Sequence, residues 1–379
     1  MVTGLEPQTA IAVSPVKTAA EMDAFVDLPW RIYAGDKNWV PPLKNEFRRL
    51  LDPARHPFWL HGRRELFLAR RGNQVVGRIA AIVDDNYNRF HEERMGIWGF
   101  FECLDDPQAA AALFAAAENW CRAEGMTFIR GPLNPSTNYE IGLLLEGFEY
   151  PPTIMMTYNP RYYLDLVSGC GYVKEKDLLA FLINWQSNVA TRVSKLAARI
   201  KRNNHITIRK AERKKFDREL SIVKKLYDSS LMRNWGFVPM TDAEIEDMGK
   251  LVAKIGDEDL VFFVNYNDEP VGLCIILPDV NRLLMRLNGK LGLWGILKAL
   301  WYRKEVTGIR GVMFGFLPEY QKIGLPLVAF DYVNEVLRRK NYQYFELGWN
   351  LEDNEPINQF DREVGGTEYK KYRIYRKPL

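Results

Sequence analysis

Two stretches of this chain share one arrangement of apolar and polar positions. Residues 66–86 read LFLARRGNQVVGRIAAIVDDN, and residues 261–281 read VFFVNYNDEPVGLCIILPDVN. In each, β-branched and aromatic residues lie on both sides of a short polar turn, which is typical of two antiparallel strands joined as a hairpin. The pattern therefore predicts a strand–turn–strand element in each half of the chain.

The similarity between the halves continues beyond these hairpins. A shift of 195 residues places Phe67 on Phe262 and Asp84 on Asp279. A shift of 216 residues then matches Gly99–Phe100 with Gly315–Phe316, Asn134 with Asn350 and Asn138 with Asn354. We interpret the chain as two copies of one α/β unit. Residues 1–184 form the N-terminal unit, 185–203 a basic connecting helix and 204–379 the C-terminal unit.

Composition agrees with two folded domains and narrows the chemistry. The 379 residues are 47% hydrophobic, enough for a core in each copy. The four cysteines contain no C-x-x-C and the four histidines no H-x-x-x-H, so we expect no metal site and no disulfide framework. The chain shows no leader-like start and no uncharged apolar stretch of about 20 residues, so we expect a cytoplasmic protein that does not span a membrane.

A strand-to-helix junction in the second copy is a candidate anion site. The strand at 311–316 is followed by the turn LPEYQKIGLP and then by a helix over 327–340. Backbone N–H groups at a helix start can bind phosphates, Gly324 permits close approach and Lys322 adds positive charge. A plain glycine turn is the commonplace alternative.

The corresponding junction in the first copy has the opposite charge. Asp105-Asp106-Pro107-Gln108 stands where the second copy has residues 321–324. The junction contains no glycine, and a carboxylate about 4–6 Å from a phosphate costs on the order of 1–4 kcal/mol for each pair of charges. We therefore expect one phosphate site, in the C-terminal unit, with the N-terminal unit as scaffold or acceptor side.

The second junction resembles the GNAT superfamily of acyl-CoA-dependent N-acyltransferases, whose motif is Q/R-x-x-G-x-G/A between the fourth strand and the third helix. The chain has Gln321-x-x-Gly324-x-Pro326, in which Pro326 departs from the usual Gly or Ala. The resemblance covers residues 204–379 well and 11–184 more faintly. It implies an α/β fold of two tandem GNAT-like units, each a mixed twisted sheet flanked by helices. It also implies acyl-CoA as co-substrate, bound by Phe316, Leu317, Gln321, Lys322, Ile323, Gly324, Leu325 and Asn354.

The same resemblance directs attention to candidate catalytic residues. The strand GVMFGF lacks the acidic base common in the superfamily, and the position of the usual tyrosine acid holds Asp361, which cannot donate a proton when ionised. We take Glu346 and Glu140 as candidate bases and Tyr369 as the candidate acid, with Tyr372, Tyr320 or water as alternatives. Glu346 has a structural alternative as an edge carboxylate paired with a Lys or Arg.

Four further residues are candidates for contact with the acceptor: Asn138, Tyr158, Trp235 and Asn350. Here too a structural role competes. Asn350 and Asn354 follow a strand and suit Asx turns that fix the next loop. Trp235 suits a buried packing position.

A basic amphipathic segment covers residues 280–304. Its six Lys and Arg residues are accompanied by no acid, and Leu284, Leu287, Leu291, Trp294 and Trp301 recur at helical spacing. We expect either peripheral contact with an anionic membrane, at the inner membrane face, or packing against the protein with a solvated basic side. A second basic tract at 192–225 has thirteen Lys and Arg against three acids but no recognition motif, so we expect no nucleic acid partner.

The stretches LPWRIYAGDKNWVPPL, GPLNPSTN and NWGFVPMT resemble a bacterial tandem-GNAT family that includes a ceramide synthase. That resemblance implies an N-acyltransferase that uses acyl-CoA to form an amide on a lipid-like amine, a sphingoid base in particular. Two alternatives stay open: a soluble acetyl-CoA-dependent N-acetyltransferase of a small amine, and a non-catalytic CoA-binding module.

Overall fold

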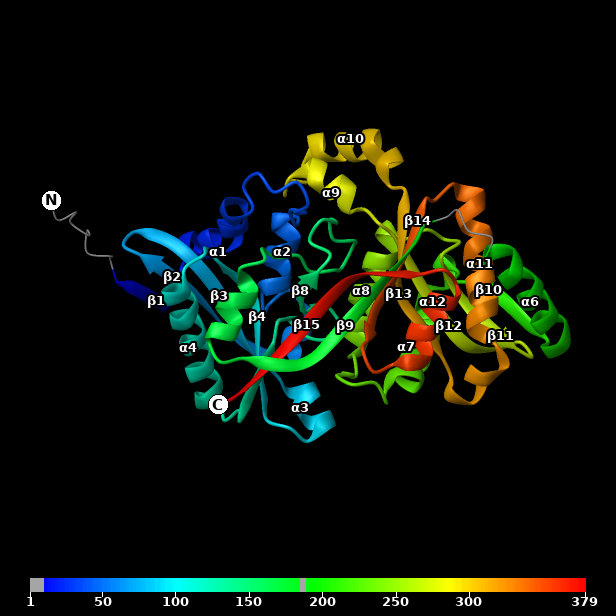
Figure 1. Ribbon diagram of the computed structural model, residues 1–379, viewed down its shortest axis with the longest axis horizontal. Coiled ribbons are helices and arrows are strands. Elements are labelled where there is room, and N and C mark those ends of the chain that lie inside the picture. The colour runs from blue at the N-terminus through cyan, green and yellow to red at the C-terminus, as the bar shows by residue number, and fades with distance from the viewer. Residues whose placement is uncertain (1–9, 185–188) are drawn as a thin grey trace. The chain divides into compact units, whose positions relative to one another are not determined.

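The computed structural model describes residues 10–184 and 189–379, which form two compact units (Figure 1). Among the described residues, unit 1 comprises 10–151, 157–176 and 372–379, and unit 2 comprises 152–156, 177–184 and 189–371. Three segments therefore lie in another unit than the contiguous ranges expected from the sequence. Residues 152–156 and 177–184 belong to the second unit, and the last eight residues belong to the first. The connecting helix expected at 185–203 is observed from Val189 as part of the second unit, and residues 185–188 lie outside the described residues.

Unit 1 has an α/β architecture. Its helices include α1 (Ala19–Ile32), α2 (Lys44–Leu51), α3 (Asp85–His91), α4 (Pro107–Ala123) and α5 (Tyr163–Gly169), with a 3₁₀ helix η1 (Pro57–Leu60). Its strands include β1 (Ile11–Pro15), β2 (Gly62–Arg71), β3 (Gln74–Asp84), β4 (Met95–Cys103), β5 (Phe128–Gly131), β6 (Leu133–Asn134), β7 (Glu140–Ile141) and β8 (Leu143–Glu146).

Unit 2 repeats this plan. Its helices include α6 (Val189–Asn204), α7 (Phe216–Leu231), α8 (Asp242–Ile255), α9 (Asn281–Leu287), α10 (Leu293–Tyr302), α11 (Leu325–Lys340) and α12 (Glu355–Glu363), with 3₁₀ helices η2 (Arg213–Lys215), η3 (Arg303–Glu305) and η4 (Pro318–Ile323). Its strands include β10 (Ile206–Lys210), β11 (Val261–Tyr266), β12 (Glu269–Pro278), β13 (Gly308–Phe316) and β14 (Tyr344–Leu351). Two further strands, β9 (Val173–Asn184) and β15 (Thr367–Pro378), begin in one unit and end in the other.

Each unit contains a mixed sheet. In unit 1 the strand order is β1-β2-β3-β4-β5-β15, and in unit 2 it is β10-β11-β12-β13-β14-β9. Neighbouring strands are antiparallel except for one central parallel pair in each unit, β4 with β5 and β13 with β14. The predicted hairpins are confirmed, as β2–β3 and β11–β12.

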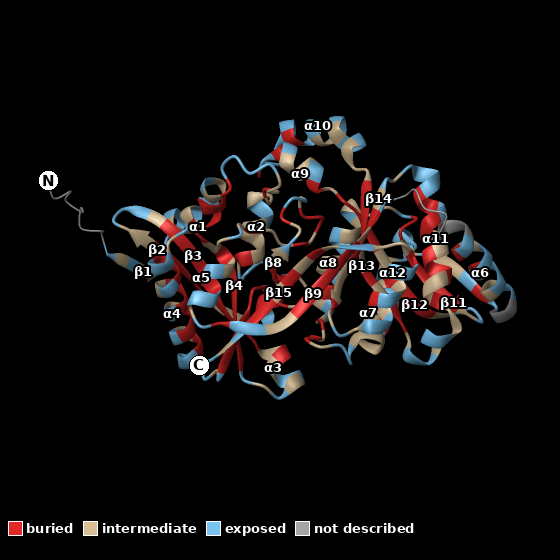
Figure 2. Cartoon of the chain, in the orientation of Figure 1, coloured by how far each residue is buried: buried red, intermediate tan, exposed pale blue. Residues whose placement is uncertain are grey.

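Alternation along the strands explains why helices cover both faces of the sheet in unit 2. Phe262 and Cys274 belong to the same buried cluster as residues of α11, whereas their neighbours Phe263 and Leu273 pack with Leu226 of α7. Successive strand residues point to opposite faces, so a nearly continuous apolar strand buries both sides. Figure 2 shows the resulting buried strands between helices whose outer faces are exposed.

The sheet registers correct one of the shifts used to relate the two halves. Gly77 lies opposite Cys103, and Gly272 lies opposite Phe316. Because Gly77 and Gly272 differ by 195, β4 and β13 correspond with a shift of 213, from 316 − 103, rather than 216. The shift of 216 holds for the next strand, since Phe128 and Tyr344 occupy the same position opposite Met95 and Gly308.

Candidate functional site

The central parallel strands of unit 2 separate half-way along their length. β13 and β14 are paired only from Gly308 with Tyr344 to Gly311 with Leu347. Beyond that point β13 stays with β12, and β14 stays with β9. The two strands thus open a splay between residues 312–316 of β13 and 348–351 of β14.

One backbone N–H at the end of β13 faces this splay. The N–H of Leu317 donates to the carbonyl oxygen of Val271 at 2.9 Å. Since hydrogen bonds in an antiparallel ladder alternate, the N–H of the preceding residue, Phe316, points away from β12. No residue that the structure describes accepts a hydrogen bond from it. Phe316 therefore offers a preformed donor to a ligand, whereas the N–H of Leu317 is already used.

The equivalent position in unit 1 is closed by the unit's own side chains. The register makes Cys103 the counterpart of Phe316, and the N–H of Cys103 donates to the hydroxyl oxygen of Tyr163 at 2.9 Å. Nearby, the N–H of Phe100 donates to Oδ1 of Asn134 at 2.7 Å. Since Tyr163 is fully buried, this splay has no free donor at that point. The two units differ in the chemistry that they offer although they share a fold.

The helix that follows β13 begins without a side-chain cap. Gly324, with φ of 84°, lies between η4 and α11, and no side chain accepts from the first turn of α11. A Cβ on Gly324 would lie 2.7 Å from Cδ1 of Ile200 on α6. Gln321 donates through Nε2 to the carbonyl oxygen of Phe316 at 3.1 Å, which joins this turn to the end of β13.

The matching helix in unit 1 supplies its own anion. Asp106 caps α4, and its Oδ1 accepts from the N–H groups of Gln108 and Ala109, each at 3.1 Å. Arg71 pairs with the same carboxylate at 2.8 Å, and these contacts lower the pKa of Asp106 although its partial burial opposes them. The ionised carboxylate of Asp106 therefore already occupies the positive N-terminal end of α4, where a phosphate would otherwise bind.

Glu346 on β14 is the most deeply buried of the predicted catalytic residues. Its side chain is fully buried, its Oε2 accepts a hydrogen bond from Thr153, and its Oε1 has no partner within the described part of the chain. Burial raises the pKa of the Glu346 carboxyl, an effect that the Arg310 charge partly opposes. The expected edge carboxylate is thus a core group with one oxygen available.

Polar contacts around Glu346 hold residues 152–156 in unit 2. Arg310 donates through Nη1 to the carbonyl oxygen of Ile154 and through Nη2 to that of Gly348, each at 3.0 Å. Asp279 accepts from the N–H of Ile154 at 3.0 Å and from the hydroxyl of Tyr344 at 2.6 Å. This network fixes the backbone beside Glu346.

Asp361 on α12 lies against the splayed part of β14. Nδ2 of Asn350 donates to its Oδ2 at 2.7 Å, and the side chain of Asp361 is buried. Burial raises the pKa of Asp361 to about 7, despite the Asn350 hydrogen bond. A substantial fraction of Asp361 carboxyl groups is therefore protonated near neutral pH, and a protonated carboxyl can donate a proton. The predicted Asx turn at Asn350 is wrong, because the N–H of Glu352, two residues on, donates to the carbonyl oxygen of Asp177 at 3.0 Å.

The structure distributes the other predicted residues as follows. Leu325 is fully buried, Ile323 packs on the core, and Lys322 is exposed. Asn354 is the N-cap residue of α12, and its side chain makes no capping hydrogen bond. Trp235 is half-buried and follows α7 in the chain. The end of α7 lies close to β13, since the hydroxyl oxygen of Ser230 would be 3.1 Å from a Cβ added to Gly315. Tyr369 is half-buried on β15 in unit 2, whereas Glu140, Asn138 and Tyr158 belong to unit 1.

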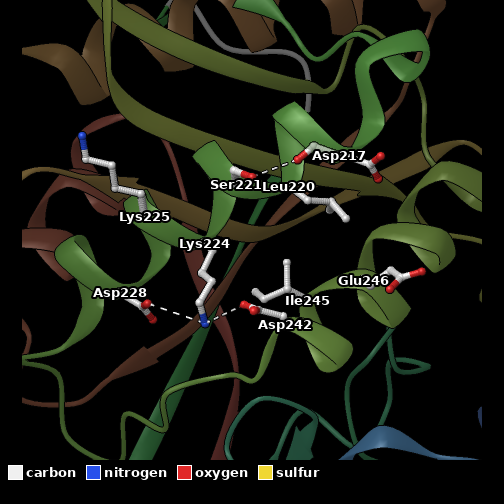
Figure 3. Close-up of a pocket in the computed structure, with 9 residues that line it drawn as sticks. All are labelled: Asp217, Leu220, Ser221, Lys224, Lys225, Asp228, Asp242, Ile245 and Glu246. Carbon is white, nitrogen blue, oxygen red and sulfur yellow. Dashed lines mark hydrogen bonds and ion pairs between the residues drawn. The ribbon is translucent and has the colours of Figure 1, made fainter.

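A surface groove of about 500 Å³ lies between α7 and α8 (Figure 3). Its lining is mixed in charge: Asp217, Leu220, Ser221, Lys224, Lys225, Asp228, Asp242, Ile245 and Glu246. Lys224 lies between two carboxylates, 3.4 Å from Asp242 and 4.0 Å from Asp228. None of the lining residues comes from β13, β14 or η4, so the groove is separate from the splay.

The described residues contain neither a metal cluster nor a membrane-spanning helix. No group of three or more His, Cys, Asp or Glu side chains in residues 10–184 and 189–379 is placed to hold a metal ion. Over the same residues, no helix has both the length and the apolar character needed to cross a membrane.

Comparison with known proteins identifies the family. No protein-family model matches the chain. The chain is 35% identical over 379 residues to a protein of Caulobacter vibrioides named bacterial ceramide synthase, covering 97% of this chain and 98% of that protein. It is 32% identical to protein YghO of Escherichia coli over 95% of this chain and 93% of that protein. The chain belongs to the bacterial ceramide synthase family.

Solved structures show that this chain has the tandem GNAT fold. A tandem GNAT protein from the clavulanic acid biosynthesis pathway matches 97% of this chain and 98% of its own with a TM-score of 0.56 and 11% identity. A glucosamine N-acetyltransferase region of a fungal multi-domain β-N-acetylglucosaminidase matches with a TM-score of 0.60 and 14% identity, over 98% of this chain and 38% of that longer chain. The chain thus has the tandem GNAT fold, and its membership of the bacterial ceramide synthase family makes it an N-acyltransferase.

Several residues of this family member were missed by sequence reasoning. Arg310 had a visible signal, since it is a charged residue inside the otherwise apolar strand GIRGVMFGF. Thr153 had none, because its contact with Glu346 joins positions 193 residues apart. Tyr163 gave no signal either, since its role depends on a backbone N–H 60 residues away.

Proposed function

We propose that this protein transfers the acyl group of an acyl-CoA to the amine of a lipid-like acceptor, a sphingoid base in particular, to give a ceramide. The observation that carries the proposal is the difference between the two splays. In unit 2 the N–H of Phe316 is open, whereas in unit 1 Tyr163 occupies the N–H of Cys103. The acceptor class rests on the 35% identical relative named bacterial ceramide synthase.

In this proposal the acyl-CoA lies in the unit 2 splay. The N–H of Phe316 donates to the thioester carbonyl oxygen and stabilises the oxyanion that forms when the amine attacks. The pyrophosphate lies at the uncapped start of α11, where Gly324 adopts a φ of 84° and Lys322 adds positive charge. Leu317, Gln321, Ile323 and Leu325 shape this turn, and Asn354 lies at the start of α12. No metal takes part in the proposed step.

Glu346 is the proposed general base. The amine must lose a proton as its nitrogen attacks the carbonyl carbon and the carbon–sulfur bond breaks. Burial raises the pKa of Glu346, and a base with a pKa closer to neutrality accepts a proton more effectively. Its unpartnered Oε1 is the atom available to the amine, directly or through a water. Asn350 and Trp235 are proposed acceptor contacts in the same unit, and Glu140, Asn138 and Tyr158 stay predictions in unit 1.

The departing thiolate needs a proton, and Asp361 is the proposed donor. Its carboxyl is held by Asn350 on the splayed part of β14, and its protonated form is available near neutral pH. Tyr369 is the alternative donor from the same unit. Both residues stay predictions until a variant separates them.

Asp361→Asn should make the protein more stable than the wild type at pH 8, and by a smaller margin at pH 5. The folded-state pKa of Asp361 is raised to about 7, so the wild type loses stability as the pH rises from the ordinary value of 3.8 toward 7. Asparagine does not titrate, so the difference in unfolding free energy should grow by on the order of 2 kcal/mol between pH 5 and pH 8. Urea unfolding at both values measures it. Asp268→Asn, in an exposed turn, is the control, and parallel behaviour of the two variants would contradict the burial argument.

The proposal includes the cellular setting expected from the sequence. The protein would be cytoplasmic, with peripheral contact between residues 280–304 and the anionic inner face of the membrane. A lipid-like amine resides in such a membrane, so this location brings the enzyme to its acceptor.

A turnover assay tests the proposed function. Release of free CoA should be measured for acyl-CoA donors from acetyl to long-chain, each with and without a sphingoid base. We expect release only when a long-chain donor and the base are both present, with the amide product seen by mass spectrometry. Turnover of acetyl-CoA with small amines would favour a soluble acetyltransferase instead, and acyl-CoA binding without turnover across the panel would favour a non-catalytic module.

A further inference from the structure

Helix α10 exposes an unusual amount of apolar surface. Leu293, Trp294 and Trp301 are 83%, 80% and 81% exposed, and Ile296, Leu297 and Leu300 are each at least half exposed. Only Gly295 in this helix is buried, with Ala299 and Tyr302 partly buried. These three positions are spaced i, i+4 and i+7, so a single narrow stripe faces the protein. Figure 2 shows exposed residues along most of α10.

The neighbouring helix α9 buries its apolar side chains, so the apolar positions that the sequence places on one helical stripe over 280–304 do not share one surface. Leu287 is buried and Leu284 is partly buried, so the apolar side of α9 faces the protein. Arg286 on α9 pairs with Glu305 at 3.3 Å. Within residues 280–304, the exposed apolar side chains are therefore confined to 291–301.

Basic residues flank this surface without acidic partners. Lys290, Arg303 and Lys304 are exposed at the two ends of α10, and Lys298 is exposed between Trp294 and Trp301. None of these four makes an ion pair with any residue in the described ranges. Their long stems can extend along an apolar phase while the charges reach phosphate groups.

The exposed apolar side chains of α10, together with the basic residues around them, fit an anionic lipid bilayer as the binding partner of this surface. An apolar patch of this kind is rare on a monomeric soluble protein and marks an interaction surface. Ten residues of helix are about 15 Å long, half of what a hydrocarbon core requires, so α10 cannot cross it. A short helix with exposed Trp and Leu side chains and only basic charges matches the features of helices that lie in the plane of the membrane interface.

We propose that α10 inserts in the interfacial plane of an anionic lipid bilayer. The side chains of Leu293, Trp294, Leu297 and Trp301 lie among the acyl chains, and the four basic residues reach lipid phosphates. α9 stays packed on unit 2 and does not insert. The inference refines the membrane contact included in the proposed function, but its test needs no turnover, so the two can fail separately.

Vesicle co-sedimentation tests this inference. The probes are phosphatidylcholine vesicles with and without phosphatidylglycerol. The proteins are the full-length wild type, the double variant Trp294→Glu/Trp301→Glu, and the control Leu60→Glu, in which another exposed apolar residue is changed (75% exposed). Thermal unfolding verifies that each variant is folded.

The wild type should bind vesicles that contain phosphatidylglycerol more tightly than phosphatidylcholine alone, and added salt should weaken that binding. The double variant should lose at least about tenfold in affinity, since the two aromatic side chains proposed to enter the bilayer become charged. The Leu60→Glu control should bind as the wild type does. No binding of the wild type to anionic vesicles, equal binding of the double variant, or a stable dimer that the double variant abolishes would each overturn the inference.

Discussion

Glu346→Gln is expected to lower kcat by about a hundredfold to ten-thousandfold while acyl-CoA binding is retained. Glutamine has the shape of the carboxylate but cannot accept the proton of the amine, and general base catalysis contributes about that much. The residue is fully buried with a hydrogen-bonded Oε2 and an open Oε1, so the substitution should preserve packing. Steady-state release of CoA measures kcat, and titration with a non-reactive acyl-CoA analogue measures binding.

Thr153→Val separates the catalytic role of Glu346 from a structural one. The threonine hydroxyl donates to Oε2 of Glu346, and valine removes this bond while leaving the carboxylate in place. If Glu346 only anchors residues 152–156, the valine variant should be as impaired as the glutamine variant. If Glu346 is the base, Thr153→Val should keep most of the activity, although its pH dependence should shift. Activity of Glu346→Gln within about tenfold of the wild type would rule out the proposed base.

Gly324→Glu should weaken acyl-CoA binding by about a hundredfold. Gly324 has a φ of 84°, which disfavours any side chain, and a Cβ there would approach Ile200 to 2.7 Å. The substitution would also add a negative charge to the start of α11, where the pyrophosphate is proposed, and like charges a few ångströms apart cost on the order of 1–4 kcal/mol at an effective dielectric constant of about 20. Isothermal titration with the acyl-CoA analogue gives the affinity.

A matched control separates the site from backbone strain. Gly125 in unit 1 has a φ of 80°, and a Cβ added there would have no atom within 4 Å, so Gly125→Glu imposes similar backbone strain away from the proposed site. Its acyl-CoA affinity should equal that of the wild type. Equal loss in both variants would mean that the glycine at 324 matters for folding rather than for phosphate binding.

The sequence allowed the repeated fold to be predicted because the signal is local. Apolar residues on both sides of a polar turn placed the hairpins β2–β3 and β11–β12, and the helical spacing in 327–340 placed most of α11. Matching Gly99–Phe100 to Gly315–Phe316 with a shift of 216 was wrong, because two identical dipeptides do not show which residues of β4 and β13 lie opposite the preceding strand. In both sheets an irregular pairing lies near this place, between Arg78 and Ala80 in unit 1 and between Ile275 and Ile276 in unit 2.

The decisive features of the site depend on contacts between distant residues. Tyr163 closes the unit 1 splay by accepting from Cys103, and no pattern near either residue predicts that bond. The pKa of Asp361 follows from burial, which the polar sequence of α12 conceals. The two leucines of α9 and the exposed side chains of α10 share one helical periodicity in the sequence, and only the break between the helices separates them.

A crystal structure with a non-reactive acyl-CoA analogue is the sharpest test of the proposed site in unit 2, because it locates the acyl carbonyl. We expect one analogue for each chain, with its carbonyl oxygen within hydrogen-bonding distance of the N–H of Phe316 and its pyrophosphate at Gly324. An analogue bound in the unit 1 splay, or one whose carbonyl has no contact with Phe316, would contradict this expectation.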